Sequence, residues 1–191
     1  MRTGKATRDG VPSTVTWGLL AVFVLHDLEE LVTMPSWLSA RVARLRRSHP
    51  DAPPVVWKIL DPGPAHTAAA IGMMGVVVAA AAAAGARTRG RSDFFQTTLA
   101  GFGLHALMHL GQSAAARGYT PGVATAPALV APFSWWAWRE LGRAGVRNDR
   151  FSAGDAAVTA AAVPAVIIGM HALSFGVVGL GRKARRILWG G

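Results

Sequence analysis

Four long stretches of the sequence contain no charged residue, and each is long enough to cross a lipid bilayer as a helix. They are residues 62–86, 94–116, 118–138 and 156–181. A helix rises about 1.5 Å per residue, so about 20 apolar residues cross a hydrocarbon core about 30 Å thick. A fifth apolar segment, residues 14–34, carries acidic residues near its end. We therefore predict an all-α polytopic membrane protein with five transmembrane helices.

These helices are expected to form a single integral membrane domain over residues 1–191. Their approximate bounds are 14–34, 62–86, 94–116, 120–139 and 155–181. In the first loop Leu38, Val42 and Leu45 repeat at helical spacing, with arginines on the other side. This pattern predicts an amphipathic helix over residues 36–47 that lies in the membrane interface. The proline-rich piece after it is not expected to be regular helix, because proline removes a backbone donor.

The formal net charge of +10 fits a membrane protein better than a nucleic-acid-binding protein. Lysine and arginine collect in the loops of membrane proteins, where they meet anionic lipid head groups. No aromatic and basic recognition motif accompanies the charge, so we expect no nucleic-acid partner. The chain has no cysteine, which excludes disulfides and thiolate metal ligands.

Ionisable residues within the predicted helices gather at one depth. When each residue is placed along alternating helices, all of them fall in the same half of the membrane. Their cost within a bilayer is about 2.5–3.5 kcal/mol for each charge at the helix centre. The residues are His26, Asp27, Glu29, Glu30, His66, His105, His109 and His171. A bound divalent cation would offset this cost, because imidazole and carboxylate groups are its natural ligands.

The spacing of these residues supports a shared site. His26, Glu29 and Glu30 stand at i, i+3 and i+4, on one helical face, and His105 and His109 stand at i and i+4. The predicted metal ligands are His26, Glu29, Glu30, His66, His105, His109 and His171. Asp27, Gln112 and Tyr119 are expected to contact the ligands without binding the metal. Glu29 and Glu30 are the expected acid–base groups. Taken singly, His66 and His171 are equally well explained as packing residues.

Five histidines and two glutamates exceed the ligand set of one tetrahedral zinc ion. They favour a dinuclear centre, with two iron ions as the preferred cofactor and zinc as the second choice. The expected partners are membrane lipids and an apolar small-molecule substrate.

The segment "HDLEE", residues 26–30, resembles the signature of the HXXEE-domain integral membrane proteins of bacteria. The segment "HLGQSAAARGYTPGVAT", residues 109–125, is similar to that family's later pattern of a histidine followed by an aromatic–Thr–Pro–Gly turn. The resemblance implies a membrane enzyme of a bacterial inner membrane, with His26, Glu29, Glu30 and His109 at the signature positions. "HALMH", residues 105–109, also resembles a histidine cluster of membrane fatty-acid hydroxylases and desaturases.

The leading functional hypothesis is a membrane-embedded metalloenzyme that acts on a lipid-like substrate. Iron would give hydroxylation or desaturation and would need an electron donor, whereas zinc would give hydrolysis with Glu29 or Glu30 as general base. A metal-free isomerase or cyclase that uses His/Glu acid–base pairs is a second hypothesis. A carrier of divalent cations or protons is a third, although transporters usually show internal repeats.

Overall fold

A computed structural model describes residues 10–148 and 153–189, and every regular element in these ranges is helical, as predicted. The remaining residues of the predicted domain lie outside the described part. The elements are α1 (Ser13–Ser48), α2 (Pro54–Leu60), α3 (Pro64–Arg87), α4 (Asp93–Ala116), the π-helical turn η1 (Ala126–Val130), α5 (Ala131–Arg143) and α6 (Ala153–Trp189).

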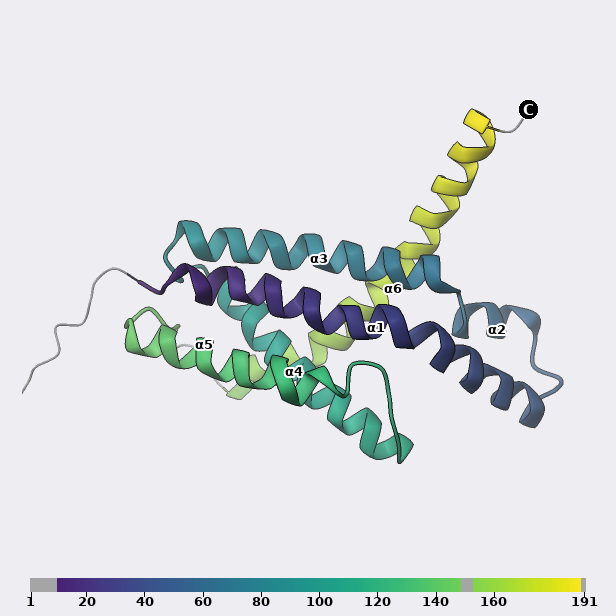
Figure 1. Cartoon of the computed structure of the whole chain (residues 1–191), viewed down its shortest axis with the longest axis horizontal. Coiled ribbons are helices and arrows are strands. Elements are labelled where there is room, and N and C mark those ends of the chain that lie inside the picture. Colours follow the sequence, from purple (N-terminus) through teal and green to yellow (C-terminus); the bar gives the residue numbers. More distant parts are fainter. Residues whose placement is uncertain (1–9, 149–152, 190–191) are drawn as a thin grey trace, which may run out of the picture.

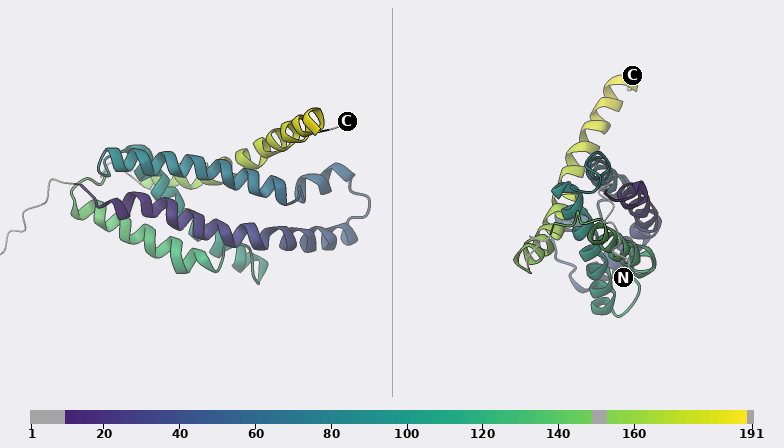
Figure 2. Two further views of the ribbon diagram at one scale, coloured as in Figure 1. Left: turned by 45° about the horizontal axis from the view of Figure 1, so that its top comes forward. Right: turned by 90° about the vertical axis from the view of Figure 1, so that its left-hand side faces the viewer.

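The helices form an elongated bundle in which α3 packs on α1, α4 and α6 (Figure 1). α3 runs antiparallel along one side of α1, and α5 lies along another side (Figure 2). α1 and α4 begin at the same end of the bundle, where the amide of Val11 donates to the carbonyl of Arg89. α6 packs on α3 and crosses it obliquely, so that the C-terminal part of α6 leaves the bundle.

The apolar core lies between α1, α4 and the η1–α5 segment. Leu19 of α1, Leu99 of α4 and Val130 of η1 are fully or almost fully buried there. Two glycines allow close contacts, because a Cβ at Gly18 would collide with Phe133 and one at Gly85 would collide with Phe95. The core therefore fixes the rotation of α1 and α4 against each other, and this rotation decides which polar residues meet.

The first helix differs from the prediction of a span followed by a separate interfacial helix. α1 is a single helix of 36 residues that continues through Pro35. The Thr33 hydroxyl donates to the carbonyl of Glu29 at 2.7 Å, and the Ser36 hydroxyl donates to the carbonyl of Thr33 at 3.0 Å. These side-chain bonds supplement the backbone bonding around the proline, which itself has no N–H.

Three other boundaries also differ. The proline-rich piece leads into the short helix α2, because Pro54 occupies the first turn, where a missing N–H costs nothing. The fourth predicted helix begins at Ala126 and not near residue 120, and the residues before it form turns. The last helix extends beyond residue 181 through the basic tail to Trp189.

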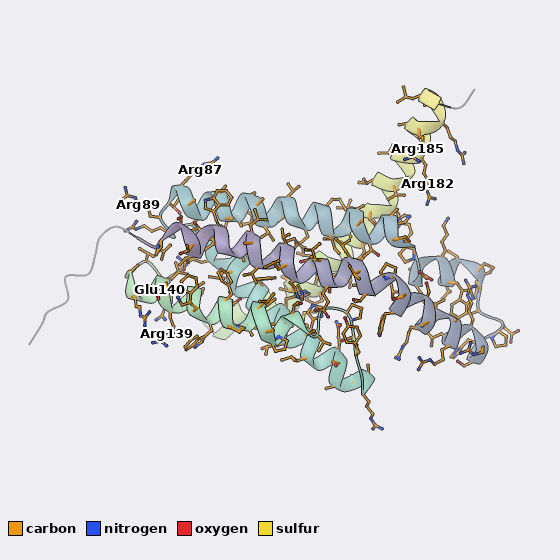
Figure 3. The ribbon with its side chains drawn as sticks, viewed as in Figure 1. Arg87, Arg89, Arg139, Glu140, Arg182 and Arg185 are labelled. Atoms are coloured by element: carbon orange, nitrogen blue, oxygen red, sulfur yellow. The ribbon has the colours of Figure 1, made fainter. Side chains whose placement is uncertain are left out.

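Two of the described helices are long and apolar enough to cross a membrane: Pro64–Arg87 and Ala161–Leu188. The other described helices do not combine that length with that hydropathy, so five membrane spans remain a prediction. Several charged side chains lie away from the middle of the bundle (Figure 3). Arg87, Arg89 and Arg139 lie at one end, and Arg182 and Arg185 lie on the projecting part of α6.

Candidate metal centre

Four potential ligands from two helices meet between α1 and α4. α1 contributes His26 and Glu30, which lie one helical turn apart, and α4 contributes His105 and His109 with the same spacing. One ligand atom from each residue lies within 4.8 Å of every other. His26 is 0% exposed and His109 is 3% exposed, whereas the Glu30 side chain retains 12% of its surface.

The Nε2 atom of His109 is the centre of this cluster. It lies 3.2 Å from Nε2 of His26, 2.8 Å from Nε2 of His105 and 3.4 Å from Oε1 of Glu30. A single proton on His109 Nε2 can serve only one of these three neighbours. The remaining contacts depend on the tautomers of His26 and His105. Where two lone pairs face each other, a cation would stabilise them.

The spacing of the four atoms fits one metal ion. In a tetrahedral site with metal–ligand bonds of about 2.0–2.1 Å, the ligand atoms lie about 3.3–3.4 Å apart. The separations from His109 range from 2.8 to 3.4 Å, and every pair of the four atoms lies within 4.8 Å. Three imidazoles and one carboxylate are also a donor set that suits zinc or iron(II). The residues present therefore fit a single divalent transition metal held by the three histidines, with Glu30 either as a fourth ligand or beside a bound water.

Glu29, the other glutamate of the motif, lies outside this cluster. Its carboxylate accepts from the Tyr119 hydroxyl at 2.6 Å, the Thr125 hydroxyl at 2.6 Å, and the backbone amides of Thr125 and Ala124 at 2.9 and 3.3 Å. Glu29 and Glu30 differ by about 100° around the helix axis, so they face different neighbours. Glu29 holds the turn that precedes η1, whereas Glu30 faces the histidines.

The same turn packs directly against a candidate ligand. Gly122 has a φ of +84°, and a Cβ at this position would lie 2.6 Å from Nδ1 of His109. Only glycine satisfies both the left-handed backbone and the close approach. The turn therefore supports the ring of His109 from behind.

Tyr119 closes the outer side of the turn and is 48% exposed. Its carbonyl accepts a hydrogen bond from the indole N–H of Trp37 at 3.0 Å, which ties the turn to the second half of α1. Desolvation, followed by the hydrogen bond to the Glu29 carboxylate, raises the pKa of the Tyr119 hydroxyl above its ordinary value.

Thr125 was not among the residues selected from the sequence. Its hydroxyl lies 2.7 Å from Nδ1 of His26 and 2.6 Å from the Glu29 carboxylate, so it links these two residues of the HDLEE segment. The nearby sequence signal was the aromatic–Thr–Pro–Gly turn at residues 119–122, which does not single out Thr125.

The other predicted site residues lie elsewhere. His66 contacts α6, with its Nδ1 atom 3.5 Å from the Ser174 hydroxyl and its ring 4.5 Å from that of Phe175. The Ser174 hydroxyl itself donates to the carbonyl of His171. Asp27 is buried on a face of α1 about 100° from His26, and Gln112 is exposed. None of these four belongs to the group of converging ligands among the described residues.

A helical chain with a buried His/Glu cluster of this kind is a candidate metal-binding protein with two helices able to span a membrane. A family model described as "Protein of unknown function with HXXEE motif" matches residues 17–137, which is more than half of the chain. The chain therefore belongs to this HXXEE family, as the sequence predicted, and the match includes the whole cluster. The comparisons with curated proteins and with solved structures each gave no match.

Proposed function

We propose that the protein is a membrane-embedded metallohydrolase with one metal ion, preferably zinc, bound by His26, His105 and His109 beside Glu30. The observation that carries this proposal is the convergence of three imidazole nitrogens and one carboxylate oxygen around His109 Nε2. Three imidazole ligands with a further position for water are a known arrangement of catalytic zinc.

A single ion accounts for the geometry better than two ions. The sequence-based preference for two irons rested on the number of ligands at one depth. Of those seven residues, four converge, while Glu29 is saturated by four hydrogen bonds and His66 faces α6. A second ion would need ligands beyond the four that meet between α1 and α4.

The residues would divide the chemical work as follows. Zinc bound here would polarise a substrate carbonyl and make water nucleophilic near neutral pH. The three histidines would hold the ion in place. Glu30, whose side chain retains 12% of its surface, would accept the proton of the attacking water and pass it to the leaving group.

The outer surfaces of α1 and α4 favour an apolar environment. Leu28 and Val32 on α1, and Leu107 and Leu110 on α4, are all exposed, on helix faces other than the one that carries the cluster. Exposed apolar side chains on neighbouring helices are typical of a surface that faces lipid. We therefore expect an ester or amide of a lipid-like molecule that reaches the site from the bilayer.

We further propose that five segments span a bacterial inner membrane: the two apolar helices α3 and α6, and in addition α1, α4 and η1–α5. His26 and His105 lie about 18–20 Å along their helices from the common end of the bundle. This depth is beyond the middle of a hydrocarbon core about 30 Å thick. A metal would offset the cost of these polar groups at that depth.

Iron-dependent oxidation is a second candidate, because two histidines and a carboxylate are also the donor set of non-haem iron oxygenases. It would use the same four residues and would require an external electron donor. Metal identity separates the two candidates, since iron would make the purified protein absorb in the near-ultraviolet or visible range.

The proposal is tested by metal analysis of detergent-purified protein beside His109→Ala and Glu30→Ala. We expect about one zinc per wild-type chain and its loss in His109→Ala. His49→Ala is the matched control, because His49 is exposed near the end of α1. Metal-free wild-type protein, or full metal content in His109→Ala, would contradict the proposal. Turnover that survives chelation would favour the acid–base isomerase, and metal flux in liposomes would favour a carrier.

A further inference from the structure

The Glu29 carboxylate has a hydrogen-bonding arrangement that fixes the direction of each bond. Two of its four partners are the backbone amides of Ala124 and Thr125, and a backbone amide can only donate. The Tyr119 hydroxyl is the third donor, at 2.6 Å. An ionised carboxylate satisfies all of them, because it offers only acceptor sites. The remaining partner, the Thr125 hydroxyl, must therefore donate as well.

The Thr125 hydroxyl has one proton, and that proton is directed to Glu29. Toward His26 the same oxygen offers a lone pair, and the Nδ1 atom of His26 lies 2.7 Å away. Nδ1 must then carry the proton of the neutral imidazole. The Nε2 atom of His26 is left with a free lone pair, and this is the atom that faces His109 at 3.2 Å.

We propose that Glu29 is a positioning residue that acts through Thr125, selecting the tautomer of His26 whose Nε2 atom can bind the metal. This inference rests on the proposed function, since the benefit of the tautomer is metal binding at His26. Ligating histidines commonly have their second ring nitrogen held by a carboxylate, carbonyl or water, and loss of such a partner reduces metal affinity about 10–100-fold. Here a threonine hydroxyl stands between carboxylate and imidazole.

Glu29 also acts on His109 through the turn. Its bonds to Tyr119, Ala124 and Thr125 hold both ends of the segment that contains Gly122, and Gly122 packs against the His109 ring. One carboxylate thus supports a ligand of α1 and a ligand of α4. The two adjacent glutamates therefore have different roles. Glu30 lies beside His109, and Glu29 accepts hydrogen bonds from the turn before η1.

The test uses full-length protein with ¹⁵N-labelled histidine and measures two properties. The first is the tautomer of His26 in the metal-free protein, read from its ring-nitrogen shifts and assigned with His26→Gln. The second is zinc affinity by competition with a chelator. We expect wild-type His26 to be protonated on Nδ1. Thr125→Val should lose this preference and bind zinc about 10–100-fold more weakly, and Thr125→Ser should restore both properties.

Two further variants separate a positioning role from general destabilisation. Thr98→Val is the matched control, because Thr98 is a half-buried residue of α4 whose hydroxyl, among the described residues, donates to the carbonyl of Phe94 in its own helix. It should leave the tautomer and the affinity unchanged. Glu29→Gln should resemble Thr125→Val, because its amide can donate to Thr125 and reverse the direction of the bond.

Each outcome decides the inference. A wild-type His26 protonated on Nε2, or wild-type affinity in Thr125→Val, would overturn it, and should Thr125→Val fail to fold, the wild-type tautomer alone still decides. Wild-type protein that bound no zinc would refute the proposed function. The tautomer of His26 would then still show whether Glu29 and Thr125 orient this ring.

Discussion

His26 and His109 lie 83 residues apart in the sequence, and their Nε2 atoms are 3.2 Å apart. Their rings meet nearly edge to face, with centroids 4.8 Å apart and an interplanar angle of 75°. Two imidazole nitrogens aimed at each other in a buried space gain little unless a proton or a cation lies between them. This contact supports the proposed metal site between α1 and α4, and a shared proton is the alternative.

Substitution of single histidines should distinguish those in the cluster between α1 and α4 from those that lie only at the same predicted membrane depth. His105→Ala and His109→Ala each remove a member of the cluster, so both should lose bound metal. His66→Ala and His171→Ala should keep it, because His66 contacts α6 and neither residue lies in the group of ligands. Metal content per chain measures this directly. Equal loss in His66→Ala would mean that α3 also supplies a ligand.

Gly122→Ala should disturb the site more than a glycine substitution with the same backbone strain elsewhere. Both Gly122 and Gly145 have positive φ values, +84° and +64°, but only Gly122 abuts a side chain, that of His109. Gly145→Ala should cost about 1–2 kcal/mol of stability through its backbone alone. Gly122→Ala should cost more and should also weaken zinc binding, as measured by thermal unfolding and chelator competition. Equal effects on zinc binding would argue against a role of the turn in supporting His109.

The titration of Tyr119 should report the Glu29 contact without interference, because the chain contains a single tyrosine. Desolvation and the hydrogen bond to Glu29 raise the pKa of this hydroxyl. Tyrosinate absorbance should therefore appear above the ordinary value of about 10, and Glu29→Gln should lower the midpoint. Since the folded pKa is the higher one, this contribution to stability is complete below the unfolded pKa and is lost as pH rises through the folded pKa. An unchanged midpoint in Glu29→Gln would contradict the contact.

Metal removal should destabilise the protein through the site alone. A ligand that binds only the folded state at 100 times its dissociation constant adds about 2.7 kcal/mol of stability. A chelator should thus lower the unfolding temperature of wild-type protein, and added zinc should restore it. His109→Ala should respond to neither treatment. A similar response in His109→Ala would place the stabilising metal elsewhere in the chain.

The sequence predicted the helices and the two halves of the site, because both depend on spacing within one helix. The i, i+4 spacing places His26 with Glu30 and His105 with His109 whatever the helices later contact. The choice among residues at the same depth depends on how the helices rotate against each other. Glu29 and Glu30 are adjacent, yet the packing of α1 on α4 turns only Glu30 toward the histidines. In the same way, the rotation of α3 turns His66 toward Ser174 of α6 and not toward the other histidines.

The boundaries of the helices were harder to predict. The first helix was predicted to end at residue 34, but hydroxyls on Thr33 and Ser36 donate to backbone carbonyls and the helix continues through Pro35. The sequence predicted a turn at residues 119–122 but began the next helix near residue 120, because this stretch is uncharged. In the structure residues 121–124 form turns, and the Glu29 carboxylate accepts hydrogen bonds from the backbone amides of Ala124 and Thr125. Such long-range contacts carry no signal in the local sequence.

X-ray absorption spectroscopy of zinc-loaded, detergent-purified protein tests the central claim most directly. A single ion between α1 and α4 predicts about one zinc per chain in a shell of nitrogen and oxygen ligands, with scattering from about three imidazoles. Protein that binds no metal would contradict this account. So would a metal–metal vector at about 3.5–4 Å, the separation typical of two-metal sites.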